Sequence, residues 1–166
     1  MRIRRETRDH VDGVQVVTTA AFGRAAEARL VDELRGTDAW LPRFSLVALA
    51  PAGTVVGHVL GSRAHVGSAP VLALGPLSVH PAHQRRGIGH ALVHTLLGAA
   101  DARDEPLVVL LGDPRYYARF GFRPAEEYGI TPPVPAWQPH FQVRPLAAYT
   151  PALRGRFAYA EPFDGV

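Results

Sequence analysis

Apolar positions along the chain follow two periods, and their alternation predicts a mixed α/β structure. Residues 71–79 are almost wholly apolar, as expected of a strand covered on both faces. Residues 88–99 repeat an apolar side chain about every four residues, which predicts a helix with one buried stripe. Residues 107–111 form another apolar run and predict a second strand. Strand, helix and strand together indicate a parallel crossover.

The remaining pattern predicts further elements on both sides of this crossover. Strands are expected at about residues 2–6, 44–50, 54–66, 141–144 and 157–159, and helices at about 7–21 and 24–35. Residues 123–166 hold eight of the 15 prolines, with large aromatic residues between them, and this composition argues against disorder. We therefore expect one domain, residues 1–166, with 123–166 as its proline-rich C-terminal part.

The composition excludes several classes of site and of binding partner. The chain has no cysteine, which excludes disulfides, zinc–thiolate sites and cysteine nucleophiles. The net charge of +3 comes from arginines that are mostly scattered, so we expect no nucleic-acid partner. No apolar run approaches the length of a membrane span, and the N-terminus lacks the core of a signal peptide. These features favour a cytoplasmic protein without a membrane partner, and no metal site is expected.

The turn between the first strand and helix carries the strongest chemical signal. Residues 84–89 read Gln-Arg-Arg-Gly-Ile-Gly. Glycines allow another group to approach the backbone, and the first N–H groups of a helix lack internal partners. With the helix dipole and two arginines, this turn predicts an anion site, most simply for phosphate. The P-loop is excluded because the chain has no lysine, and the dinucleotide fingerprint fails because Leu92 replaces its third glycine.

A strand followed by Gln-x-x-Gly-x-Gly and a helix resembles the acetyl-CoA-binding motif of the GNAT N-acetyltransferase superfamily. A second resemblance lies at residues 112–122, whose sequence is Gly-Asp-Pro-Arg-Tyr-Tyr-Ala-Arg-Phe-Gly-Phe. This run is similar to that of the YhbS-like predicted N-acetyltransferases. The resemblance implies a GNAT-like α/β fold: a central mixed, mostly antiparallel sheet with a parallel β-α-β acetyl-CoA-binding core and helices on both faces.

The resemblance also implies an activity: transfer of an acetyl group from the cosubstrate acetyl-CoA to a primary amine of a small molecule or peptide. Tyr117 would act as the general acid, since a phenol with a pKa of about ten is protonated at neutral pH. The implied cosubstrate-binding residues are Leu77, Ser78, Val79, Gln84, Arg85, Arg86, Gly87, Ile88, Gly89 and His90. Two departures stand out. An asparagine that many members carry after the second strand is absent, and the central strand lacks an acidic base.

Glu27 and His58 are candidates for the base or for binding the acceptor. Glu27 lies on the apolar face of its predicted helix. It either lines an acceptor pocket, to bind an ammonium or take its proton, or reaches solvent from the first helical turn. His58 shares a strand face with Val56 and Leu60, so it is either a satisfied core residue or a base in the pocket.

The sequence alone is also compatible with other functions. A non-catalytic acyl-CoA-binding sensor or interaction module would share the turn and would not need Tyr117. The sequence does not identify the acceptor or the base, or decide between acetyl-CoA and a longer acyl-CoA as donor. It is compatible with a monomer or a homodimer.

Overall fold

The computed structural model describes residues 1–165. The strands are β1 (Arg2–Arg5), β2 (Trp40–Leu49), β3 (Val55–Val66), β4 (Ala69–Val79), β5 (Leu107–Leu111), β6 (Arg123–Pro124), β7 (Ile130–Thr131), β8 (Phe141–Pro145) and β9 (Gly155–Ala158). The α-helices are α1 (Val11–Phe22), α2 (Ala26–Arg35), α3 (Ile88–Ala102) and α4 (Pro114–Tyr117). Short 3-10 helices are η1 (Arg8–His10), η2 (Pro81–His83), η3 (Ala118–Phe120), η4 (Ala125–Tyr128), η5 (Pro135–His140) and η6 (Glu161–Gly165).

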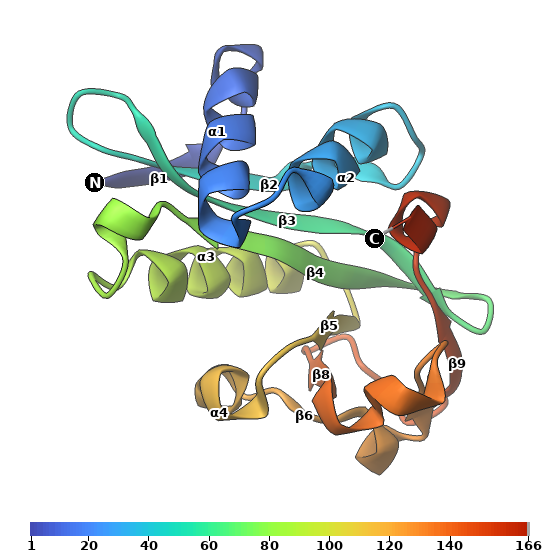
Figure 1. Ribbon diagram of the computed structural model, residues 1–166. Coiled ribbons are helices and arrows are strands. Elements are labelled where there is room, and N and C mark those ends of the chain that lie inside the picture. The colour runs from blue at the N-terminus through green and yellow to red at the C-terminus, as the bar shows by residue number, and fades with distance from the viewer. Residues whose placement is uncertain (166) are drawn as a thin grey trace.

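The strands form a mixed sheet in the order β1-β2-β3-β4-β5-β8-β6, and β9 pairs with β3 and β7. The pairs are antiparallel except β4 with β5 and β7 with β9. Helices α1 and α2 lie over one face of the sheet and α3 over the other (Figure 1). The predicted fold class, with its parallel β4-α3-β5 unit, is confirmed. No helix within residues 1–165 has both the length and the apolarity needed to cross a membrane.

Most element boundaries agree with the apolar pattern. Helix α1 ends at Gly23, whose φ of 69° is the left-handed conformation that terminates helices. On α3, Leu92 and Leu96 are fully buried as the pattern predicts. The clearest difference is β2, which begins at Trp40 rather than at residue 44. Its first four residues include the exposed Pro42 and the charged Arg43, which interrupt the apolar pattern of the rest of the strand.

Strands β4 and β5 diverge soon after they meet. Their parallel pairing is limited to Leu72 opposite Val108 and Ala73 opposite Val109. A β-bulge in β4 then shifts its register against β3. Leu74 lies opposite Gly61 and Leu77 opposite Val59, so β4 has one more residue than β3 between these two pairs. Among the described residues, the part of β4 beyond this bulge pairs with β3 on one side and with no strand on the other. The divergence leaves room for a ligand between the two strands.

A buried polar cluster ties the N-terminal segment to the sheet. The Ser45 hydroxyl donates to the Glu6 carboxylate, and Arg35 forms an ion pair with the same carboxylate. His58 Nε2 lies 2.9 Å from Ser45 Oγ. Because that hydroxyl already donates to Glu6, it accepts from His58, which assigns the imidazole proton to Nε2. His58 is fully buried, so it is a core residue.

This cluster predicts acid sensitivity. Burial lowers the pKa of His58 below 6.5. Burial alone would raise the pKa of Glu6, but its contacts with His58, Ser45 and Arg35 lower it from 4.5 to about 2. Both groups bind protons more readily when unfolded, so the free energy of unfolding should fall as the pH drops below 6.5, and further below 4.5. The Glu6 shift alone corresponds to about 3 kcal/mol.

Chemical denaturation between neutral pH and pH 3 measures this loss. Glu6→Gln should reduce the component below pH 4.5 and lower stability at neutral pH, whereas the exposed control Glu33→Gln should retain the wild-type profile. A wild-type stability that is flat across this range would contradict the proposed protonation states.

Candidate active site

A cavity of about 580 Å³ lies against the N-terminal end of α3. Its wall is built from the end of α1, the end of β4, the turn before α3 and α4. The lining residues are Ala21, Phe22, Leu77, Val79, Gln84, Arg85, Gly87, Ile88, Gly89, His90 and Tyr116. Eight of the ten cosubstrate-binding residues expected from sequence are therefore brought together here. We refer to this space as the turn cavity.

The backbone of the turn is shaped to receive an anion. Arg85 has a φ of 63° and Gly87 a φ of 82°. A positive φ is common for glycine but unusual for arginine, so the backbone at Arg85 is locally strained. The Gln84 side chain supports the turn by donating from Nε2 to the Val79 carbonyl at 3.1 Å. Gly87 is the N-cap of α3 and provides no side chain to bind the first amides of the helix. These amides and the Arg85 guanidinium together form a site that suits an anion such as phosphate.

The side chains of Ser78 and Arg86 lie outside the turn cavity. Ser78 is fully buried and its hydroxyl donates to Thr18 Oγ1 at 3.3 Å, so its side chain faces α1. Arg86 is exposed beside the turn. Any contribution of Ser78 to cosubstrate binding must therefore come from its backbone, and that of Arg86 from its charge.

A second cavity, of about 530 Å³, lies where β4 and β5 diverge. It shares Phe22 and Leu77 with the turn cavity. The lining residues are Phe22, Glu27, Leu30, Leu74, Gly75, Pro76, Leu77, Leu111, Gly112, Asp113, Tyr117, Trp137, Tyr159 and Phe163. We refer to it as the acidic cavity, because Glu27 and Asp113 are the charged residues among those lining it.

Tyr117 lines the acidic cavity, and its neighbour Tyr116 lines the turn cavity. Its ring covers Gly112 so closely that a Cβ added there would lie 2.6 Å from the ring. The rings of Tyr116 and Phe122 pack edge-on against it, at centroid distances of 4.9 and 5.9 Å. Burial, reinforced by Tyr116, raises the pKa of Tyr117 to about 12. The phenol is therefore fixed in place and remains a proton donor at neutral and moderately alkaline pH.

The turn that carries Tyr117 forms as its sequence predicts. The Asp113 carboxylate caps α4 by accepting from the Arg115 backbone N–H at 2.9 Å, and Pro114 occupies the first helical position. Asp113 also pairs with the Arg115 side chain. Its carboxylate therefore has a structural role at the rim of the cavity.

The two candidates for the base, Glu27 and His58, lie in different surroundings. Glu27 is buried on α2, lines the acidic cavity and pairs with Arg24. His58 lies on the same face of the sheet as α1 and α2 but lines neither cavity, and its partners are Ser45 and Glu6. Glu27 thus faces a cavity that can hold a ligand, and His58 does not.

Sequence reasoning did not assign Trp137, Tyr159 and Phe163 to the site. They come from η5, the residue after β9, and η6, and all three line the acidic cavity. The sequence pattern placed the proline-rich C-terminal part near the acceptor site, but it did not indicate which of its aromatic residues line the cavity.

Comparisons with known proteins agree with this geometry. A sequence model of the acetyltransferase (GNAT) family matches residues 17–122, which include both the turn and Tyr117. The chain belongs to the GNAT family. The uncharacterized N-acetyltransferase YjhQ of Escherichia coli K12 is 33% identical over 157 residues, covering 90% of this chain and 86% of YjhQ.

Two solved GNAT structures share the whole fold. YhbS from E. coli, crystallised with CoA, has a TM-score of 0.92 and 30% identity, covering 98% of this chain and 91% of YhbS. A GNAT acetyltransferase from Brucella melitensis, in complex with acetyl-CoA, has a TM-score of 0.81 and 34% identity, covering 98% and 97% of the two chains. The resemblance to YhbS-like GNAT proteins is confirmed. No cluster of three or more potential metal ligands occurs within residues 1–165.

Proposed function

We propose that this GNAT protein transfers an acetyl group from acetyl-CoA to a primary amine of a small molecule or peptide by direct attack. The observation that carries the proposal is that the two cavities share Phe22 and Leu77, and that Tyr117 lines the second cavity with its ring packed against Tyr116 of the first. The turn cavity suits the coenzyme, and the acidic cavity suits a cationic acceptor. The CoA and acetyl-CoA complexes of the two relatives support the choice of cosubstrate.

The chain would hold acetyl-CoA through its backbone. The first amides of α3 and the Arg85 side chain would bind the diphosphate. Residues 77–79 of β4 lack a neighbouring strand on the β5 side, so they can pair with the pantetheine amides as a strand would. The Leu77 N–H is a candidate donor to the oxyanion that develops on the thioester carbonyl.

Tyr117 would act on the leaving group. As the amine nitrogen bonds to the carbonyl carbon and the carbon–sulfur bond breaks, the phenol donates its proton to the departing thiolate. Glu27 would either bind the acceptor ammonium or take its proton, because an amine must be neutral to attack.

A direct test is incubation of the purified protein with acetyl-CoA and a broad panel of amines. Release of free CoA thiol and the mass gain of one acetyl group on the amine would together support the proposal. Tight acetyl-CoA binding without acetylation of any amine would favour the non-catalytic sensor instead.

The raised pKa of Tyr117 makes a prediction about alkaline pH. With the amine saturating, kcat should not decline until the pH approaches about 12, because the acid form of Tyr117 persists to that point. The measurement is kcat for one amine across this pH range, with protein stability checked at each pH. A decline centred below the ordinary tyrosine value of about ten would argue against Tyr117 as the acid.

A further inference from the structure

The two cavities differ in charge as well as in position. Arg85 and His90 line the turn cavity, whereas the charged side chains around the acidic cavity are the carboxylates Glu27 and Asp113. The volume of about 530 Å³ lies in the range of roughly 300–1,000 Å³ that is usual for small-molecule sites. A cationic small molecule is therefore the ligand that the second cavity suits.

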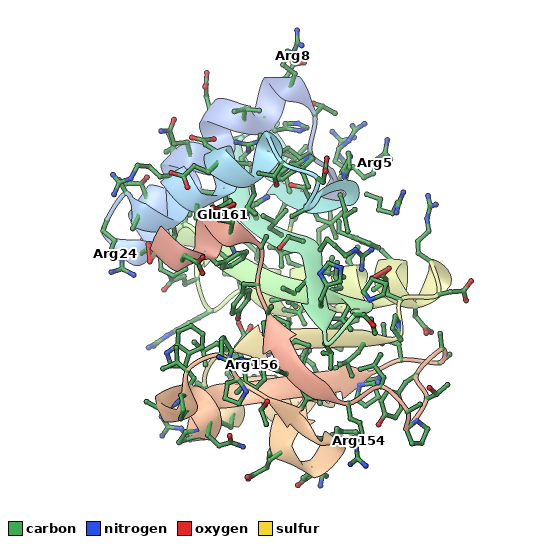
Figure 2. The ribbon with its side chains drawn as sticks, turned by 90° about the vertical axis from the view of Figure 1, so that its right-hand side faces the viewer. Arg5, Arg8, Arg24, Arg154, Arg156 and Glu161 are labelled. Carbon is green, nitrogen blue, oxygen red and sulfur yellow. The ribbon has the colours of Figure 1, made fainter. Side chains whose placement is uncertain are left out.

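Glu27 is the carboxylate that can exchange its partner for a ligand. Its side chain is only 7% exposed, while that of its partner Arg24 is 64% exposed. Arg24 lies at the outer edge of the molecule (Figure 2) and reaches Glu27 Oε1 from Nε at 2.8 Å. Asp113 is engaged by the α4 backbone and by Arg115. An incoming ammonium can thus replace Arg24 at Glu27 without disturbing a helix cap.

The wall of the acidic cavity contributed by the C-terminal part of the chain is aromatic. Tyr159 and Phe163 stack with centroids 4.4 Å apart and an interplanar angle of 21°. Trp137 meets Tyr159 edge-on at 6.3 Å. Segment η6, which carries Phe163, packs beside α2 (Figure 2 labels Glu161 on this segment). We refer to Trp137, Tyr159 and Phe163 as the aromatic wall.

Building on the proposed function, we propose that the acceptor is a small primary amine with an aromatic ring or another bulky apolar group. Glu27 binds its ammonium, and the aromatic wall packs against its apolar body. Glu27 then takes one proton to give the free amine. After the carbon–nitrogen bond forms and Tyr117 protonates the thiolate, a second nitrogen proton restores the phenol through water, and Glu27 releases the first proton to solvent.

A polypeptide acceptor fits this cavity less well. Peptide backbone groups need hydrogen-bond partners when they leave water. Apart from its carboxylates and tyrosines, the cavity is lined largely by apolar side chains from α2, β4, β5 and the aromatic wall. The pattern of one carboxylate facing an apolar surface suits a compact amine with a single charged end.

Tryptophan fluorescence can report acceptor binding without turnover. The chain has two tryptophans, and Trp40 lies outside both cavities. In a Trp40→Phe background with saturating CoA, 2-phenylethylamine should therefore change the emission of Trp137. Ethylamine, which has the same ammonium without the ring, should bind about 10-fold or more weakly.

Variants test separately the binding of the ammonium by Glu27 and the packing of the apolar group against the aromatic wall. Glu27→Gln should weaken 2-phenylethylamine binding about 10-fold to 100-fold, as expected for loss of a charge-assisted contact. Glu33→Gln, on the exposed side of the same helix, should leave it unchanged. Arg24→Gln should tighten amine binding, because Glu27 then has no competing cation. Phe163→Ala should weaken 2-phenylethylamine while changing ethylamine little.

The failure of this inference and that of the proposed function are distinguishable. If 2-phenylethylamine neither perturbs Trp137 nor is acetylated, while peptides or purely polar amines are acetylated, the acceptor class is wrong and the transferase activity stands. An Arg24→Gln variant that binds the amine more weakly would also overturn the role of Glu27. If no amine of any class accepts the acetyl group, the proposed function itself fails.

Discussion

Tyr117→Phe is expected to reduce kcat about 100-fold to 1,000-fold, within the range usual for loss of a general acid. The thiolate would then leave without a proton donor. The affinity for acetyl-CoA should stay within about twofold, since the phenylalanine ring retains the packing against Gly112, Tyr116 and Phe122. Steady-state kinetics with one amine and direct titration of acetyl-CoA measure the two effects separately.

The matched control is Tyr128→Phe, which removes a phenol hydroxyl outside both cavities. It should leave kcat and KM unchanged. None of the side-chain hydrogen bonds in the described residues uses the Tyr117 hydroxyl, so a loss of kcat in Tyr117→Phe with an unchanged Tm indicates chemistry. An unchanged kcat would remove Tyr117 from the mechanism.

Gly89→Val is expected to raise the Kd for acetyl-CoA about 100-fold or more, which corresponds to the ~3 kcal/mol upper end of overpacking costs. A Cβ at this position would lie 2.9 Å from the Tyr116 hydroxyl and 3.7 Å from Val79 Cγ2. The added branches would therefore occupy the turn cavity, where the first amides of α3 must approach the ligand. Isothermal titration with acetyl-CoA measures the change.

Gly98→Val places the same substitution on the same helix, where a Cβ meets nothing within 4 Å. This control should bind acetyl-CoA as the wild type does. Retention of full affinity by Gly89→Val would mean that the coenzyme lies elsewhere.

The parts of the site that depend on local backbone geometry could be predicted from sequence. The turn at residues 84–89 and the Asp113 cap of α4 are formed by neighbouring residues, whose glycine and proline positions largely determine the conformation. The placement of Tyr117 follows from that cap. These elements were therefore predicted with nearly correct boundaries.

The parts that depend on distant segments could not be predicted. His58 looked like a possible pocket base because its sequence neighbours are apolar, but its partner Ser45 comes from another strand. Tyr159 and Phe163 of the aromatic wall follow β9, which pairs with β3 and β7, whereas Trp137 comes from η5. Periodicity within a segment contains no information about such pairings, so the composition of the acidic cavity emerged only from the fold.

The early divergence of β4 from β5 also affects how the protein should be handled. Residues 74–79 have a neighbouring strand on one side only, so part of their hydrogen-bonding capacity is open on the other. A coenzyme seated along this edge would bind the folded state and not the unfolded chain, so storage buffers that contain CoA should raise the Tm of the protein.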